Sequence, residues 1–132
     1  MSGETNLERL LATMSPVLME GEFVFLSFSN ATYGDHAELK PIASMIESEG
    51  LTLVVEKSQA DRHALEYQSS FKGISLEVHS SLDAVGLTAA FSATLTERGI
   101  SANVIAGYFH DHIFVQADDA ARAIAALQKL SD

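Results

Sequence analysis

Residues 71–115 carry the pattern that most constrains the fold of this chain. The pattern predicts a strand, a turn that contains an Asp and a Gly, a helix, and two further strands joined by a tight turn, with a second helix directly after them. In the first strand Ile74, Leu76 and Val78 alternate with polar residues, as expected of a strand with one buried face. Such a β-α-β-β-α unit is a compact module of the α+β class.

The two helices of this unit have recognisable boundaries. Leu87, Phe91 and Leu95 form an apolar stripe, and Gly99 is a suitable residue for ending the first helix. Asp118 is the predicted N-cap of the second helix, because a short acidic side chain can accept a hydrogen bond from the first helical amides. The strands between the two helices are predicted at residues 101–109 and 112–116.

The first half of the chain contains similar elements. Leu7, Leu10 and Leu11 have helical spacing and predict a short helix over residues 6–13. Residues 22–29 are apolar on both faces, which predicts a strand that is covered on both sides. A further strand is predicted at residues 51–56, and Ser58 is the predicted N-cap of a helix that reaches residue 65.

The two halves coincide when the chain is compared with itself at a shift of 60 positions. Apolar strand residues, predicted caps and helix faces then match together, which indicates an ancient duplication. The matching pairs include Val55 with Val115, Ser58 with Asp118, and Ala60 with Ala120. Residues 41–49, taken alone, fit either a helix or one arm of a hairpin. Because residues 43–48 correspond to residues 101–108 in this comparison, a strand is the better prediction there.

The charge of the chain argues against two classes of partner. With 18 acidic and 8 basic side chains the net charge is −10 at pH 7. Phosphate backbones and anionic membranes would be repelled, so neither nucleic acid nor a membrane is an expected partner. The chain has no cysteine, which excludes disulfides and thiol catalysis. It shows neither an apolar run long enough to span a bilayer nor a secretory signal, so a cytoplasmic location is expected.

Two short segments of the second half resemble the ACT domain, a small βαββαβ regulatory module that binds amino acids. The first is Asp-Ala-Val-Gly-Leu at residues 83–87, and the second is Gly-Ile-Ser-Ala-Asn-Val at residues 99–104. In the family the first turn commonly reads Asp-x-Pro-Gly-hydrophobic, so Val85 stands where a proline is frequent. The longer stretch 78–115 is more specifically similar to a group of bacterial tandem ACT-domain proteins, and this similarity covers nearly the whole chain.

The resemblance implies an α+β fold of two tandem ferredoxin-like βαββαβ repeats, with an antiparallel sheet and helices on one face. The first ACT-like half, residues 1–66, is degenerate and begins with the extra helix, and the second half is residues 67–132. The second half ends at its second helix, which leaves no room for a fourth strand. We therefore expect the halves to share strands, so that one half completes the sheet of the other within a single fused unit.

The chain direction predicts a candidate site in the second half. In a sheet of this topology, three features lie at the same end of the sheet. They are the end of the first strand, the turn that follows it, and the turn between the strands predicted at residues 101–109 and 112–116. The free amides of Gly86 and Leu87, where the helix starts, suit a carboxylate, whereas Asp83 or Asp111 could accept a hydrogen bond from an amine. Gly86 and Asp83 equally fit an ordinary tight turn that binds nothing. The predicted ligand-binding residues are Ser80, Ser81, Asp83, Val85, Gly86, Leu87, Asn103, His110, Asp111 and His112.

His110 and His112 are predicted to lie on one side of an extended chain, because side chains alternate along a strand. His79 could join them, and three imidazoles with an open position would suit zinc, with Asp111 orienting one ring. Such histidines also serve to hydrogen-bond a turn or to line a polar pocket, and no second cluster of metal ligands accompanies them in the sequence. The prediction therefore names no metal, no cofactor and no catalytic residue.

These observations together predict a non-catalytic regulatory or sensor protein, not an enzyme, that binds a small effector; by the resemblance this effector is an amino acid. Asn103 and the histidines would set the selectivity of the site. An exposed sheet edge favours a homodimer. Two alternatives stay open: a protein–protein assembly module without a small ligand, and a metal-dependent enzyme that uses His79, His110 and His112.

Overall fold

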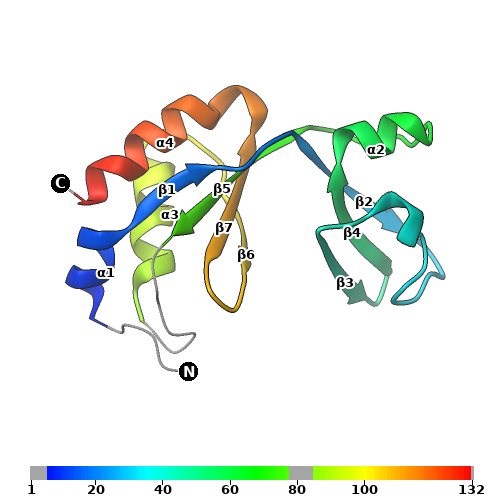
Figure 1. Cartoon of the computed structure of the whole chain (residues 1–132), viewed down its shortest axis with the longest axis horizontal. Helices are drawn as coiled ribbons and strands as arrows, with labels where there is room; N and C mark the ends of the chain where they lie inside the picture. Colours follow the sequence, from blue (N-terminus) through cyan, green and yellow to red (C-terminus); the bar gives the residue numbers. More distant parts are fainter. Residues whose placement is uncertain (1–5, 78–84, 132) are drawn as a thin grey trace. The chain divides into compact units, whose positions relative to one another are not determined.

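The structure of the chain, a computed structural model, describes residues 6–77 and 85–131 (Figure 1). Its contacts divide the chain into two compact units. One unit is discontinuous along the chain and is called the composite unit; the other is called the inner unit. The composite unit combines residues 1–20 with residues 72–132, and the inner unit is residues 21–71.

Among the described residues, the sheet of the composite unit has the strand order β1-β5-β7-β6. The strands are β1 Ser15–Leu18, β5 Phe71–Glu77, β6 Asn103–Ala106 and β7 Asp111–Gln116. β1 pairs with β5 and β6 pairs with β7, and both pairs are antiparallel. The strand predicted at residues 101–109 is shorter than expected, because its last residues form the turn between β6 and β7.

β1 was not predicted from the sequence, and it supplies the fourth strand of this sheet. It pairs with β5, and Ser15 stands opposite Glu77. The segment is short and contains Pro16, so it lacks the alternation typical of a strand, and the proline is tolerated because β1 lies at an edge of this sheet. The prediction that one half completes the sheet of the other is confirmed by the pairing of β1 with β5, but the contacts divide the chain into two compact units and not into the single fused unit that was predicted. The predicted halves, residues 1–66 and 67–132, were divisions of the sequence. In the structure the N-terminal segment that contains β1 packs with the second half.

The helices of the composite unit cover one face of its sheet. They are α1 Leu7–Thr13, α3 Leu87–Glu97 and α4 Ala120–Gln128. Leu10 of α1, Phe91 of α3 and Leu127 of α4 are fully buried in one core with Ile74 of β5 and Ile113 of β7. The predicted α+β class with helices on one face is thereby confirmed. None of the helices in the described part of the chain combines the length and the apolar character that a membrane crossing requires.

The inner unit is built on an antiparallel sheet with the order β3-β4-β2. Its elements are β2 Phe23–Phe28, the 3-10 helix η1 Ala37–Leu39, β3 Ala43–Glu47, β4 Gly50–Glu56 and α2 Lys57–Arg62. Val24, Leu39, Leu53 and Ala60 are fully or almost fully buried in its core. The strand predicted at residues 43–48 is confirmed as β3.

The predicted N-caps Ser58 and Asp118 are wrong. Helix α2 starts at Lys57, so Ser58 lies inside it, and Asp118 lies inside the 3-10 helix η2 Ala117–Asp119, which precedes α4. The reason is that β4 and β7 run into their helices without a connecting loop. The Lys57 N–H donates to the carbonyl oxygen of Glu22 at 2.8 Å, which satisfies a donor at the helix start without a side-chain cap.

The correspondence between the two halves extends to burial. β4 and β7 occupy matching positions in the shifted comparison, and each leads directly into helical structure. Each strand also buries three consecutive side chains, Leu53, Val54 and Val55 in β4 and Ile113, Phe114 and Val115 in β7. This agreement supports the duplication inferred from the sequence.

Candidate functional site

The start of helix α3 and the turn between β6 and β7 lie at the same end of the composite sheet (Figure 1). This is the arrangement that the chain direction predicts. The predicted ligand-binding residues Ser80, Ser81 and Asp83, and the metal candidate His79, lie outside the described residues. The described part of the candidate site therefore consists of the helix start and the hairpin turn.

Gly86 is the N-cap residue of helix α3 and has a left-handed conformation, with a φ of 96°. A side chain would be strained at that φ, and its Cβ would lie 3.1 Å from Cδ2 of Leu7 in α1. Leu87, the first residue of the helix, is buried in the core, whereas Val85 is 83% exposed. Gly86, as the N-cap residue, has no side chain that could cap the helix. The amides of its first turn have no intrahelical partners and lie at the positive end of the helix dipole.

The turn between β6 and β7 is closed by Gly107, whose N–H donates to the carbonyl oxygen of His110 at 2.9 Å. The close approach requires a glycine: a Cβ at residue 107 would lie 2.8 Å from that oxygen and 3.2 Å from Nε2 of His112. Tyr108 and Phe109 at the tip are more than half exposed, and their ring centroids lie 5.0 Å apart, edge to face. The turn thus presents two aromatic rings outward and packs the His112 ring against its backbone.

Both imidazoles of this turn have an unused nitrogen. The Nδ1 atoms of His110 and His112 are buried and have no hydrogen-bond partner among the described residues. Burial lowers the pKa of His112, and a protonated His110 lowers it further, while the charges of Asp111 and Glu77 act in the opposite direction. The His112 ring is consequently neutral near neutral pH and can both donate and accept hydrogen bonds.

Asp111 is half-buried at the start of β7. Burial raises the pKa of its carboxyl group, and the neighbouring His112 opposes that shift. A carboxylate that is partly removed from water is stabilised by an incoming cation, because the cation replaces part of the lost hydration. Asp111 is therefore suited to accept hydrogen bonds from an ammonium group.

Asn103 lies apart from the other described candidates. It begins β6, and the turn lies at the other end of that strand. Its side-chain Nδ2 donates to the carbonyl oxygen of Phe114 at 3.3 Å, across the hairpin. The structure does not bring Asn103 to the turn.

Glu77 and Gly107 were not among the site residues predicted from the sequence. Glu77 is the last residue of β5, and β5 is the sheet neighbour of β7, so strand pairing brings its charge near His112. The pairing of these strands is not visible in local sequence. Gly107 carried a usable signal, because a glycine directly before a predicted tight turn often marks a close backbone approach.

The described residues contain no group of three or more histidine, cysteine, aspartate or glutamate side chains placed to hold a metal ion. His110 and His112 supply two imidazoles, and the third candidate, His79, lies outside the described residues. The geometry supports a polar turn beside a helix start, with groups that suit both an anion and a cation.

We expect the free energy of unfolding to fall as the pH drops below about 6.5, the ordinary pKa of histidine. Because the pKa of His112 is lowered in the folded state, the unfolded chain binds the proton first, and acidification favours unfolding. The substitution His112→Gln should remove the part of this fall in the free energy of unfolding that comes from protonation of His112. Urea denaturation at about pH 7 and about pH 5.5 measures it.

The matched control for this prediction is His63→Gln, because His63 is an exposed residue at the end of α2. The loss of stability between the two pH values should be smaller in the His112→Gln protein than in the His63→Gln protein. An unchanged pH dependence in the His112→Gln protein would contradict the assignment to His112.

Comparisons with known proteins agree with this fold. Family models described as ACT domain match residues 2–72 and residues 68–129. The comparison with curated proteins gave no match. Among solved structures, a Vibrio cholerae protein of unknown function, described as a possible transport protein, is 52% identical, and the match covers 96% of each chain with a TM-score of 0.87.

Other solved structures share the fold at much lower identity. An Agrobacterium tumefaciens protein is 14% identical, and the match covers 89% of each chain with a TM-score of 0.70. The ligand-free regulatory subunit of aspartate kinase from Thermus thermophilus is 10% identical, and the match covers 92% of this chain and 99% of that chain with a TM-score of 0.65. These matches confirm the predicted fold.

Proposed function

Because the chain belongs to the ACT domain family, we propose that it is a non-catalytic regulatory protein that binds an amino acid where helix α3 begins. The family and the fold shared with a regulatory subunit of aspartate kinase support a regulatory, ligand-binding role. One observation carries the choice of site. The start of α3 at Gly86 lies at the same end of the sheet as the start of β7 at Asp111 (Figure 1).

The proposed site binds the two charged groups that every free amino acid carries. The backbone amides of Gly86 and Leu87 hold the carboxylate, because the first amides of a helix lack intrahelical partners and the helix dipole favours an anion. Asp111 accepts hydrogen bonds from the ammonium group, which stabilises its partly buried charge. Ser80, Ser81 and Asp83, which lie outside the described residues, stay in the proposal as ligand-binding residues.

Selectivity among amino acids is assigned to the two imidazoles. The unused Nδ1 atoms of His110 and His112 offer hydrogen bonds to a ligand side chain. A buried polar atom is stabilised most by a partner that satisfies it, so the proposal favours a polar ligand side chain over an aliphatic one. Val85, more exposed than the rest of the helix start, forms the apolar border of the site.

The proposal also includes a cytoplasmic homodimer. β6 is an edge strand of the composite sheet and β3 is an edge strand of the inner sheet, and unpaired strand edges favour pairing with another chain. Met45 and Ile46 on β3 are more than half exposed, which adds apolar area at that edge. Light scattering coupled to size-exclusion chromatography tests this, and a monomeric mass at micromolar concentration would reject the dimer.

Thermal denaturation in the presence of each common amino acid tests the proposed function. A ligand that binds the folded state stabilises it, so an amino acid at about 100 times its Kd should raise the melting temperature by roughly 5 °C or more. If no amino acid at about 10 mM changes the melting temperature, the proposal fails and an assembly module without a small ligand becomes the better account. Zinc below about a tenth of an equivalent in untagged protein would reject the metal-dependent enzyme.

A further inference from the structure

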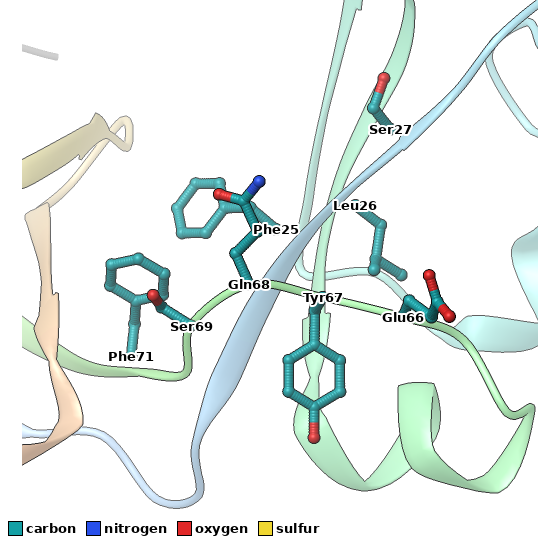
Figure 2. A pocket seen from close by; sticks show the side chains of 8 residues that line it. All are labelled: Phe25, Leu26, Ser27, Glu66, Tyr67, Gln68, Ser69 and Phe71. Carbon is teal, nitrogen blue, oxygen red and sulfur yellow. The ribbon is translucent and has the colours of Figure 1, made fainter.

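A cavity of about 300 Å³ lies in the inner unit, beside strand β2 (Figure 2). One wall is formed by β2, and the other by the segment that leads back toward β5, which we call the return segment (residues 66–70). All the residues that line the cavity belong to the inner unit. The cavity is therefore distinct from the candidate site at the start of α3.

The cavity takes the place of missing strand pairs. β2 pairs with β4 along its whole length, but its pairing with β5 consists of Phe23 opposite Phe71. Continuing this antiparallel register would place residue 25 opposite residue 69, and residue 27 opposite residue 67. The return segment has no regular structure, and these residues line the cavity instead. The cavity thus arises where the return segment separates from β2.

Two side-chain hydrogen bonds hold the return segment in its place. The Tyr67 hydroxyl donates to Oδ1 of Asp61 at 2.7 Å, and Asp61 is also paired with Lys57 Nζ at 3.1 Å. At the other end the Ser70 hydroxyl donates to Oε1 of Glu22 at 2.8 Å. These contacts lie on either side of residues 68 and 69, which line the cavity. The return segment is therefore tied to the rest of the inner unit by side chains on both sides of the residues that line the cavity.

The lining of the cavity defines the chemistry that it can bind. Among the described residues that line it, Glu66 carries the one charge, and no basic side chain is present. Phe25 and Phe71 provide an apolar end, with ring centroids 5.2 Å apart in an edge-to-face arrangement. Figure 2 shows the two rings together and the Glu66 carboxylate well apart from them. Aromatic rings and a carboxylate both attract cations, whereas an anion would be repelled by the carboxylate and would find no basic side chain in the lining.

From this arrangement we infer that the cavity binds a small organic cation that carries an apolar group. Its volume lies at the lower end of the range for ligand pockets, so it accepts a single small molecule. The apolar group packs against Phe25 and Phe71, and the ammonium group lies toward Glu66. Ser69 and Gln68, which also line the cavity, supply neutral hydrogen-bonding groups between the two ends.

The test uses the full chain and the probe 2-phenylethylamine, which is a cation at neutral pH. Neutral 2-phenylethanol and anionic 3-phenylpropionate serve as matched probes of similar shape. In ¹H–¹⁵N NMR spectra the amine should shift the amides of residues 66–69 with a saturable Kd, and the anion should leave them in place. These amides lie outside the candidate amino-acid site, so either proposal can fail without the other.

Two variants sharpen the test. Glu66→Gln should weaken amine binding about threefold to fivefold, as expected for an exposed ion pair, whereas Glu49→Gln removes the same charge from the exposed turn between β3 and β4 and should not. Ser69→Leu places a larger side chain in the cavity and should abolish binding. The inference is overturned if the amine does not bind at about 10 mM, if all three probes bind equally, or if both charge variants weaken binding alike.

Discussion

Replacing Leu10 with alanine is expected to lower the free energy of unfolding by about 2–5 kcal/mol. Leu10 lies in α1, near the start of the chain, yet its side chain is fully buried in the core that the second half mostly builds. Removing the branched end of the side chain leaves a cavity that the surrounding helices fill only in part. A domain of ordinary stability has about 5–15 kcal/mol, so the loss should be evident in urea denaturation.

Leu18→Ala is the matched control for this prediction. It makes the same chemical change in the same N-terminal segment, but Leu18 is 45% exposed in β1. We expect the control to cost less than about 1 kcal/mol. If Leu10→Ala cost no more than Leu18→Ala, the first 20 residues would not belong to the composite core.

Replacing Gly86 with alanine is expected to weaken amino-acid binding by at least about tenfold, because hydrogen bonds to a charged group are each worth roughly that much. The added Cβ would stand at the helix entrance, 3.1 Å from Leu7 Cδ2, and the residue would resist a φ of 96°. Both effects move the amides that the proposal assigns to the carboxylate. Isothermal titration with the amino acid that raises the melting temperature measures the change in Kd.

Gly99→Ala separates strain from binding. Gly99 follows the other end of α3, also with a positive φ of 70°, and a Cβ there would meet nothing within 4 Å. Both alanine variants should lose about 1–2 kcal/mol of stability from the left-handed conformation. Only Gly86→Ala should lose the ligand. Equal affinities in the two variants would remove the helix start from the site.

The parts of the fold that could be predicted from the sequence are those with a strong local pattern. Leu87, Phe91 and Leu95 have helical spacing, and all three are buried in α3. β1 could not be predicted because its strand character comes from pairing with β5, far along the chain. Ser58 has the composition of a cap, but the contact between Lys57 and Glu22 decides where α2 begins.

For the candidate site, the sequence could predict only which segments lie at the same end of the sheet. Topology alone places the helix start at Gly86 and the turn that contains His110 at one end of the sheet. The position of Asn103 depends on the register in which it faces Phe114, and this register was not available from the sequence. The cavity beside β2 was equally hidden, because it arises where strand pairing stops after Phe23 and Phe71.

The central claim is that the start of α3 and the turn between β6 and β7 form one site, which binds a single amino acid molecule. The most direct measurement is a ¹H–¹⁵N NMR titration of the full chain with the amino acid that gives the largest thermal shift. The account predicts that the amides of Gly86 and Leu87 and those of residues 110–112 move together with a single Kd. Stabilisation by that amino acid with these amides unmoved, or with shifts confined to residues 21–71, would contradict it.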